Sequence, residues 1–325
     1  MSNVGPVLEL RNLTKDYPGH RALDGVSLEA PPGAFYALLG PSGCGKTTTL
    51  RLIAGFEPPT AGDIFLDGER INDRRPYERN VSTVFQNYAL FPHLTVRGNV
   101  EYGLRRRGFD GLERRVREVL ELVQLTGKDS RYPSEISGGE RQRAALARSL
   151  VLAPDVLLLD EPLSALDPNL RKQVRAELKQ LQRRVGITFL FVTHDQEEAL
   201  SLSDRVAVMH RGRIEQIGAP EDVYLRPRTR FVASFLGAVN WLDGAGIRPE
   251  ATRISRTAPA AGTRSLPATV ERCVFLGNCL QVEARLATGQ TVVAETSRLD
   301  GGFTAGESVH LWWRAADELL FPAEG

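Results

Sequence analysis

One stretch of eight residues, GPSGCGKT at Gly40–Thr47, constrains this 325-residue chain more than any other feature. It matches the pattern G-x-x-x-x-G-K-[ST] at every fixed position. The apolar segment GAFYALL before it has the length of a buried strand. The segment TTTLRLIAGF after it places Leu50, Ile53 and Ala54 at helical spacing. A strand, a glycine-rich turn and a helix in this order predict a site that holds phosphate groups.

Each residue type in this turn has a physical role. Glycines let backbone N–H groups point inward without side-chain clashes, and the start of the helix adds positive potential. We expect Lys46 to reach the β- and γ-phosphates of ATP and the Thr47 hydroxyl to ligate Mg²⁺. Cys44 is interpreted as a small filler residue. The expected ATP-binding residues here are Gly40, Pro41, Ser42, Gly43, Cys44, Gly45, Lys46, Thr47 and Thr48.

The composition of the chain argues against several classes of protein. The formal net charge is only +1, which is not typical of a polybasic nucleic-acid binder. There is no apolar run of about 18 residues, so we expect no membrane span. The N-terminal sequence lacks a basic region followed by an apolar core, so we expect no signal peptide. The spacing of the three cysteines matches no metal motif, which favours a reduced, cytosolic compartment.

Strand-like and helix-like segments alternate from residue 7 to about residue 218, which predicts an α/β fold with a largely parallel core. DVLLLDEP (Asp155–Pro162) and ITFLFVTHD (Ile187–Asp195) are predicted to contain buried strands. LERRVREVLELVQL (Leu112–Leu125) is predicted to be an amphipathic helix. A second such helix is expected between the two strands. Its apolar face comprises Leu170, Val174, Leu178, Leu181 and Val185.

After residue 235 the pattern changes to short alternating runs separated by turn signals, which predicts a small all-β domain, a barrel of about five strands. RTAPAAGTRSLP (Arg256–Pro267) is interpreted as a loop within it. In an alternating strand, one residue of the pair Trp312–Trp313 would face the core and the other would face outward or into a dimer. Packing is therefore favoured over a ligand platform for this pair.

Two carboxylates and a histidine end the predicted strands. Ligand groups gather at the carboxyl ends of parallel strands. Asp160 is placed to hold Mg²⁺, directly or through water, and Glu161 could polarise an attacking water. Together with the phosphate-binding turn, they predict ATP hydrolysis. His194 and Gln86 have no assigned role from the residues alone, because either could be an ordinary hydrogen-bonding group.

The segment ISGGERQRAALARSL (Ile136–Leu150) makes the interpretation specific. The glycine-rich turn, this serine–glycine–glycine signature, VLLLDEPLSALD and FVTHD occur in an order and spacing that resemble the ATPase subunits of ABC transporters. The region after the ATPase resembles the OB-like TOBE domain of importers of the maltose, polyamine, ferric-iron and phosphonate type. GIRPE (Gly246–Glu250) and VFLGNCLQVEARLATGQTVVAE carry that second likeness.

The resemblance implies an α/β P-loop NTPase fold, with a RecA-like core, a helical subdomain and an N-terminal β subdomain, followed by a small all-β OB-like domain. The ATPase domain would span residues 1–235, with the helical subdomain at about 87–150. The OB-like regulatory domain would span residues 236–325.

The resemblance also implies roles for individual residues. Tyr17 would stack on adenine, and Asp167 would lie at a dimer contact. Gln86 would reach Mg²⁺ and the attacking water, and His194 would contact the γ-phosphate. The implied catalytic residues are Glu161, His194 and Gln86, and the implied Mg²⁺ ligands are Thr47, Gln86 and Asp160.

The signature would close over the γ-phosphate of the opposite subunit in a homodimer. Its residues are Ser137, Gly138, Gly139 and Glu140. The family's usual signature has glutamine in place of Glu140. A negative charge there could weaken ATP-driven closure unless it points outward or pairs with a cation such as Arg141.

The function that the resemblance implies is that of the ATP-binding and ATP-hydrolysing subunit of a solute importer. It would act as a homodimer, peripheral to the cytoplasmic face of the cell membrane. Two transmembrane permease subunits would be its partners, with an external solute-binding protein as an indirect partner and no nucleic acid. FLGAVNWL (Phe235–Leu242) and the short β domain favour a polyamine, ferric iron or a phosphonate over a sugar.

Three alternatives stay open. A soluble ABC ATPase acting on nucleic acid or ribosomes usually has two cassettes or a coiled-coil insertion, and this chain has one P-loop and one signature. A binding module with a vestigial ATPase is disfavoured by Lys46, Asp160, Glu161 and His194, which are all present. An exporter subunit is disfavoured by the β extension. The sequence does not specify the solute.

Overall fold

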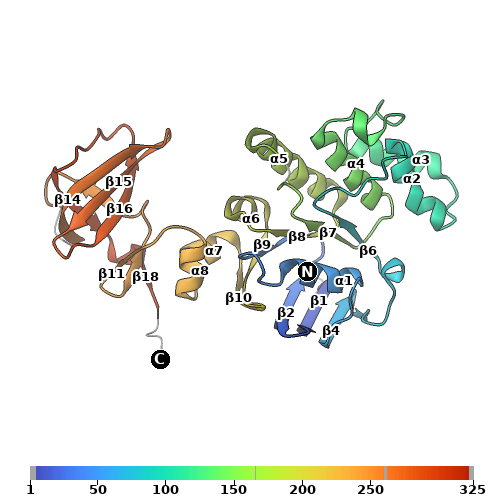
Figure 1. The fold of residues 1–325 in the computed structure, drawn as a ribbon, viewed down its shortest axis with the longest axis horizontal. Coiled ribbons are helices and arrows are strands. Elements are labelled where there is room, and N and C mark those ends of the chain that lie inside the picture. The colour runs from blue at the N-terminus through green and yellow to red at the C-terminus, as the bar shows by residue number, and fades with distance from the viewer. Residues whose placement is uncertain (1–4, 165, 260–261, 322–325) are drawn as a thin grey trace. The chain divides into compact units, whose positions relative to one another are not determined.

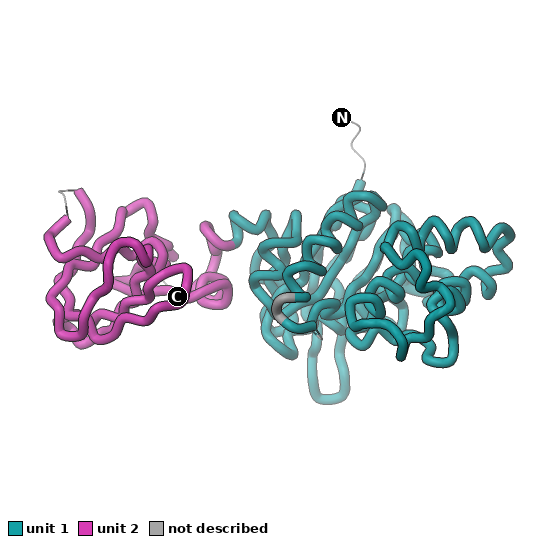
Figure 2. Tube along the Cα trace, turned by 90° about the horizontal axis from the view of Figure 1, so that it is seen from above, with its two compact units in different colours: residues 1–223 teal, residues 224–325 magenta. Residues whose placement is uncertain are grey.

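The computed structural model describes residues 5–164, 166–259 and 262–321. The chain forms two compact units, residues 1–223 and residues 224–325 (Figure 2). The sequence predicts a domain boundary at 235/236, which would leave helix α8 (Arg230–Phe235) in the first domain, whereas in the structure it belongs to the second unit. None of the helices in the described ranges is long and apolar enough to cross a membrane.

A six-stranded sheet forms the centre of the first unit, with the strand order β10-β9-β3-β8-β7-β6 (Figure 1). Its strands are β3 (Phe35–Leu39), β6 (Val81–Val84), β7 (Val156–Asp160), β8 (Thr188–Thr193), β9 (Arg205–His210) and β10 (Arg213–Gly218). The strands from β6 to β9 in this order are parallel, and β10 runs antiparallel to β9. Every residue of β3 and β8 is buried, as expected for parallel strands covered on both faces. The predicted α/β fold with a parallel core is confirmed.

A second, antiparallel sheet has the order β2-β1-β4-β5. Its strands are β1 (Leu8–Tyr17), β2 (His20–Ala30), β4 (Ala61–Leu66) and β5 (Glu69–Arg70). Leu10 and Leu23 of this sheet share one buried apolar cluster with Leu38 and Leu190 of the central sheet. The shared core fixes the antiparallel sheet, which carries Tyr17, against the sheet that carries the glycine-rich turn.

The helices of the first unit are α1 (Lys46–Ala54), α2 (Val96–Arg106), α3 (Leu112–Leu122), α4 (Gly138–Leu150), α5 (Pro168–Val185) and α6 (Gln196–Leu202), and α7 (Pro220–Leu225) crosses into the second unit. Figure 1 shows α2, α3 and α4 grouped together, within the range of the expected helical subdomain. Val174, Leu178 and Leu181 of α5 are buried, which confirms the predicted amphipathic helix. Single turns of 3₁₀ helix occur at Pro76–Glu78, Pro133–Glu135 and Ala315–Asp317.

Arg79 fixes the far end of α1. Its guanidinium is almost fully buried and donates to the carbonyls of Leu52 (2.7 Å) and Ile53 (2.8 Å) in the last turn, where helix carbonyls lack the N–H of a following turn. Gly55 follows the helix with φ +80, and a Cβ there would lie 2.6 Å from Nε of Arg79. The helix that begins at Lys46 is therefore held at its C-terminus by a buried side chain.

The second unit is all-β apart from its short helices. One sheet contains β11 (Asn240–Leu242), β12 (Ala245–Ile247) and β18 (Glu318–Leu320). The other has the order β13-β17-β14-β15-β16 and contains β13 (Arg253–Ser255), β14 (Arg264–Phe275), β15 (Cys279–Leu286), β16 (Thr291–Ser297) and β17 (Ser308–Trp313). The expected all-β domain is confirmed. Trp313 is buried and Trp312 partly exposed, as the alternation predicts.

The prediction of a loop at Arg256–Pro267 is wrong over its last four residues, because β14 begins at Arg264. Residues 260–261 of that range lie outside the described residues. Proline lacks the N–H that a central strand needs. Pro267 is tolerated because β14 pairs only with β17 at this point, and its pairing with β15 begins at Ala268.

Candidate functional site

Four neighbouring parallel strands bring the predicted site residues to one edge of the central sheet. In the order β3-β8-β7-β6, the chain leaves the strands at Gly40, His194, Glu161 and, two residues beyond β6, Gln86. The carboxyl ends of parallel strands lie on the same edge, where α/β proteins bind ligands. Residues far apart in the sequence therefore meet around the glycine-rich turn.

The glycine-rich turn has a backbone that only glycine accommodates without strain. Gly45 has φ +105, and a Cβ there would lie 2.8 Å from the carbonyl oxygen of Ala22. At Gly40 a Cβ would lie 2.3 Å from the carbonyl oxygen of Met209, a distance at which the backbone would have to move. The turn then leads directly into α1 at Lys46. This geometry is that of a phosphate-binding loop at a helix N-terminus.

The side chain of Lys46 folds over this turn. Its Nζ donates to the carbonyl oxygens of Gly40 (2.7 Å) and Pro41 (3.0 Å). Cys44 is also buried, and its Sγ lies 3.8 Å from Nζ of Lys46. Burial raises the pKa of the Cys44 thiol above its ordinary value. A neutral, packed thiol agrees with the interpretation of Cys44 as a filler residue.

Thr47 and Asp160, two of the expected Mg²⁺ ligands, are in contact. The Thr47 hydroxyl donates to Oδ1 of Asp160 at 3.3 Å. Burial raises the pKa of Asp160, although the bond from Thr47 opposes this change. Among the described residues, no three His, Cys, Asp or Glu side chains are arranged as a metal cage. One carboxylate and one hydroxyl suit Mg²⁺, which takes few protein ligands and completes its shell with water and phosphate oxygens.

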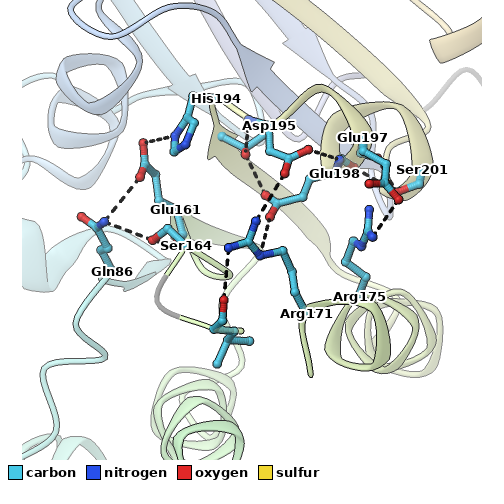
Figure 3. Close-up of polar contacts among 12 residues, drawn as sticks. Gln86, Glu161, Ser164, Arg171, Arg175, His194, Asp195, Glu197, Glu198 and Ser201 are labelled. Atoms are coloured by element: carbon cyan, nitrogen blue, oxygen red, sulfur yellow. Dashed lines mark hydrogen bonds and ion pairs between the residues drawn. The ribbon is translucent and has the colours of Figure 1, made fainter. Parts of the chain in front are cut away.

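Glu161, His194 and Gln86 form a connected group (Figure 3). Oε1 of Glu161 lies 3.1 Å from Nδ1 of His194, and the Gln86 amide donates to the other carboxylate oxygen at 3.4 Å. Glu161 has φ +45, a left-handed conformation that is uncommon outside glycine. This turn at the end of β7 separates Glu161 from Asp160, so the two neighbouring carboxylates have different partners. The Gln86 amide also donates to the Ser164 hydroxyl at 3.0 Å.

Tyr17 ends β1, and its ring is held on two sides. The hydroxyl donates to Glu57, and Nζ of Lys15 lies 5.0 Å from the ring centroid. Burial and the bond to Glu57 raise the pKa of Tyr17, and the same bond lowers the pKa of Glu57. Tyr17 is partly exposed.

The signature residues begin α4. The Ser137 hydroxyl accepts from the backbone N–H of Glu140 at 3.3 Å, and the Glu140 carboxylate accepts from the backbone N–H of Ser137 at 2.8 Å. This reciprocal pair is a capping box. The cation near Glu140 is Lys128, at 3.5 Å, and not Arg141, whose guanidinium donates to the carbonyl of Ile136 instead. The suggested pairing of Glu140 with a cation is therefore made by Lys128 rather than by Arg141.

The start of α4 and the glycine-rich turn are separate sites in one chain. Figure 1 shows α1 and α4 well apart. Gly138 has ordinary helical φ, and a Cβ there would meet nothing closer than 3.8 Å. The fold of the chain itself therefore does not require a glycine at this position. Asp167 lies just before α5, and its carboxylate accepts from the backbone N–H of Leu170 at 3.0 Å.

Several residues of the site were not predicted from the sequence. They are Lys15, Glu57, Lys128, Ser164 and Arg171. The contacts of each of these residues join segments that are distant in the chain or linked by an irregular turn, so a local sequence pattern does not reveal them. Ser164 is the exception with a sequence signal, because it lies within the SALD segment quoted above.

The fold and this group of residues define an ATPase of the ABC class, and comparisons with known proteins agree. Residues 23–164 match the ABC transporter family, and residues 245–321 match the TOBE domain. The chain belongs to the family of ABC importer ATP-binding proteins that carry a C-terminal TOBE domain.

Three relatives align with almost the whole chain. The spermidine/putrescine import ATP-binding protein PotA of Rubrobacter xylanophilus is 45% identical over 96% of this chain and 93% of its own length. The PotA of Bacillus cereus is 43% identical, with 96% and 98% covered. The uncharacterized ABC transporter ATP-binding protein YdcT of Escherichia coli is 45% identical, with 94% and 95% covered.

Solved structures resemble about two thirds of the chain. The dimeric, post-hydrolysis ATP-binding cassette MJ0796, bound to ADP and Pi, has a TM-score of 0.58 and 31% identity, covering 66% of this chain and 98% of that one. The structure of cbiO1 from Clostridium perfringens, part of the ABC transporter complex cbiONQ, has a TM-score of 0.63 and 30% identity, with 67% and 90% covered.

Proposed function

We propose that this protein hydrolyses ATP to drive polyamine import through separate transmembrane permease subunits, to which it binds at the cytoplasmic face of the membrane. The observation that carries the catalytic part is the position of Glu161, held between His194 and Gln86 at the sheet edge that bears Lys46 and Asp160. Glu161 would act as the base toward water, His194 and Lys46 would contact the γ-phosphate, and Tyr17 would stack on adenine.

Mg²⁺ would be held by Thr47 and Asp160, with Gln86 reaching toward it, and would neutralise charge on the phosphates. Thr47 and Asp160 are already in contact at 3.3 Å. The rest of the catalysis falls to the chain itself. Its backbone N–H groups and Lys46 orient the phosphates, and Glu161 accepts a proton from the attacking water.

The active form is proposed to be a head-to-tail homodimer. The glycine-rich turn and the start of α4 are two anion sites, well apart in one chain (Figure 1). Glycine lowers helix stability, and at position 138 no neighbouring group within the protomer requires the absence of a Cβ. This supports the close approach of another molecule at this position. In the dimer that molecule would be the ATP bound to the partner. Asp167 would lie at the dimer contact.

The polyamine assignment is supported by relatives that are named spermidine/putrescine import proteins and span nearly the whole chain. These relatives also favour the importer over the soluble ABC ATPase of the sequence alternatives.

The test is an uptake experiment in reconstituted vesicles that contain this chain and the two permease subunits purified with it, with Mg²⁺ and ATP inside and the external solute-binding protein outside. We expect ATP-dependent transport of radiolabelled spermidine or putrescine, and loss of transport with Lys46→Ala. If permease subunits co-purify but no polyamine is transported, the assignment of a polyamine as the solute is contradicted. If no permease subunits co-purify from detergent-solubilised membranes, the importer assignment is contradicted.

A further inference from the structure

We propose that Arg171, in the first turn of α5, is a positioning residue that fixes the Glu161–His194 pair by tying together the two segments that carry it. The proposal rests on the proposed function, in which Glu161 and His194 act on ATP. Figure 3 shows Arg171 between the turn that follows Glu161 and the segment that follows His194.

The first anchor of Arg171 is the turn between β7 and α5. Its Nη2 donates to the carbonyl oxygen of Leu166 at 3.1 Å. Leu166 is buried, and its backbone N–H donates to the carbonyl of Leu163 at 3.2 Å. The carbonyl that Arg171 binds therefore belongs to the same folded turn as Glu161, and directly precedes Asp167.

The second anchor is the segment around His194. Nη1 of Arg171 lies 3.5 Å from Oδ2 of Asp195, and its Nε lies 3.8 Å from Oε1 of Glu198. The Glu198 carboxylate accepts from the Thr193 hydroxyl at 2.7 Å, and that hydroxyl accepts from the backbone N–H of Asp195 at 3.0 Å. The residues on both sides of His194 thus belong to one network that ends on Arg171.

The network holds two carboxylates, Asp195 and Glu198, and Arg171 provides positive charge beside both. Glu198 is 3% exposed and lies beside Asp195, so two carboxylates share the guanidinium. Burial raises the pKa of Glu198, and Arg171 opposes that rise. Without Arg171, a buried carboxylate would lose its nearest counter-charge, and the segment that carries His194 would rearrange to relieve it.

The two anchors close a ring of contacts. At one end Glu161 meets His194 at 3.1 Å, and at the other end Arg171 joins the segments that carry them. The His194 side chain is 58% exposed, so little packing of its own fixes its position. A displacement of about 1 Å at a catalytic group costs up to about a hundredfold in rate.

Arg175 provides a matched control on the same helix. It lies one turn further along α5, is buried, and forms an ion pair with Glu197 at 2.9 Å. Glu197 is largely exposed and stands on α6 rather than in the turn after Glu161. Arg175→Gln therefore removes a buried arginine and an ion pair while leaving both anchors of Arg171 in place, and Arg175 lowers the pKa of Glu198 less than Arg171 does.

The experiment measures kcat and KM for ATP, with melting temperatures, for Arg171→Gln, Arg171→Lys and Arg175→Gln. We expect Arg171→Gln to lower kcat about 10- to 100-fold while KM changes less than about threefold, with partial recovery in Arg171→Lys. Arg175→Gln should keep kcat within about twofold of the wild type, even if it lowers the melting temperature as much as Arg171→Gln does. In a Glu161→Gln background, measured by single-turnover hydrolysis, Arg171→Gln should lower the rate by a smaller factor than it does in the wild type, because the Glu161–His194 pair that it positions is already disrupted.

Three results would overturn the proposal. One is an equal loss of kcat in Arg171→Gln and Arg175→Gln. Another is a full additional loss in the Glu161→Gln background, and the third is wild-type kcat in Arg171→Gln. Each of these requires a wild-type protein that hydrolyses ATP. A wild type with no hydrolysis would instead contradict the proposed function and this inference together.

Discussion

Glu140 places a charge at the start of α4, where the signature of ABC ATPases usually has glutamine. In the structure its carboxylate faces the first turn of its own helix and accepts from the backbone N–H of Ser137, with Lys128 at 3.5 Å. The bond from Ser137 holds the pKa of Glu140 below its ordinary value. The charge is thus already satisfied within the chain, so it opposes a partner's phosphate less than a free carboxylate would.

Glu140→Gln is therefore expected to change ATP hydrolysis by less than about twofold. The amide still accepts from Ser137, but loses its attraction to the helix dipole and Lys128, so the free energy of unfolding should fall by about 0.5 kcal/mol at pH 7. Because the folded pKa lies below the ordinary value of 4.5, this difference is present above pH 4.5 and is lost as the pH falls through the lowered pKa. Urea titrations at pH 7 and pH 4 measure it, with Glu118→Gln in an exposed ion pair as the control. A tenfold gain in hydrolysis would show that the charge faces the nucleotide.

The residues of the glycine-rich turn and the two carboxylates at the end of β7 could be predicted because a local pattern carries each of them. Lys128 and Arg171 could not, because their contacts depend on how separate segments pack. Arg171 looks in sequence like any polar residue of an amphipathic helix. Its partners Leu166, Asp195 and Glu198 become visible only when β7 and β8 lie side by side.

At the scale of elements, the first turn of α4 leaves open space beside Gly138. A Cβ at Gly138 would have no neighbour closer than 3.8 Å, and the backbone there is helical. Alanine at such a position usually stabilises a protein, because it reduces the conformational entropy of the unfolded chain. The same methyl group would occupy the space proposed for the partner's γ-phosphate.

Gly138→Ala should therefore raise the free energy of unfolding by about 0.5 kcal/mol while lowering ATP hydrolysis at least tenfold. Urea denaturation and steady-state hydrolysis on the same protein provide both numbers. ATP binding by the isolated chain should be unchanged, since the glycine-rich turn is untouched. Full hydrolysis in the stabilised variant would argue against closure over the signature.

Most helices and strands could be predicted from the sequence. The prediction failed where the end of a strand depends on which neighbouring strand it pairs with. The strands β3, β7 and β8 are continuous apolar runs, which identify buried parallel strands. The start of β14 was missed because Pro267 is a strong loop signal. Pro267 can lie in β14 because the pairing of β14 with β15 begins only at Ala268. No local sequence pattern reveals where this pairing begins.

At the scale of the whole molecule, the two units have separate apolar cores. Leu38 and Leu190 belong to the core of the first unit, and Val282 and Trp313 to that of the second. A ligand that binds one folded unit stabilises that unit by mass action. Separate cores therefore predict that nucleotide and a core mutation in the second unit act on different unfolding transitions.

Calorimetry should resolve two unfolding transitions in the full chain. A non-hydrolysable ATP analogue with Mg²⁺, at about 100 times its Kd, should stabilise one of them by about 2.7 kcal/mol. Trp313→Ala should destabilise the other by about 3–5 kcal/mol, because Trp313 is buried and its indole N–H donates to Glu318 at 2.9 Å. A single transition that responds to both changes would show that the units unfold together.

The measurement that tests the central claim most directly is light scattering of Glu161→Gln with Mg²⁺ and ATP, alongside its rate of hydrolysis. We predict slow hydrolysis, lower by about 10²- to 10⁴-fold, and an ATP-dependent shift from 35.8 kDa to twice that mass, because ATP stays bound between two chains. Lys46→Ala, which should lose ATP affinity, should remain at the monomer mass. Wild-type turnover in Glu161→Gln, or a monomer at saturating ATP, would contradict the account.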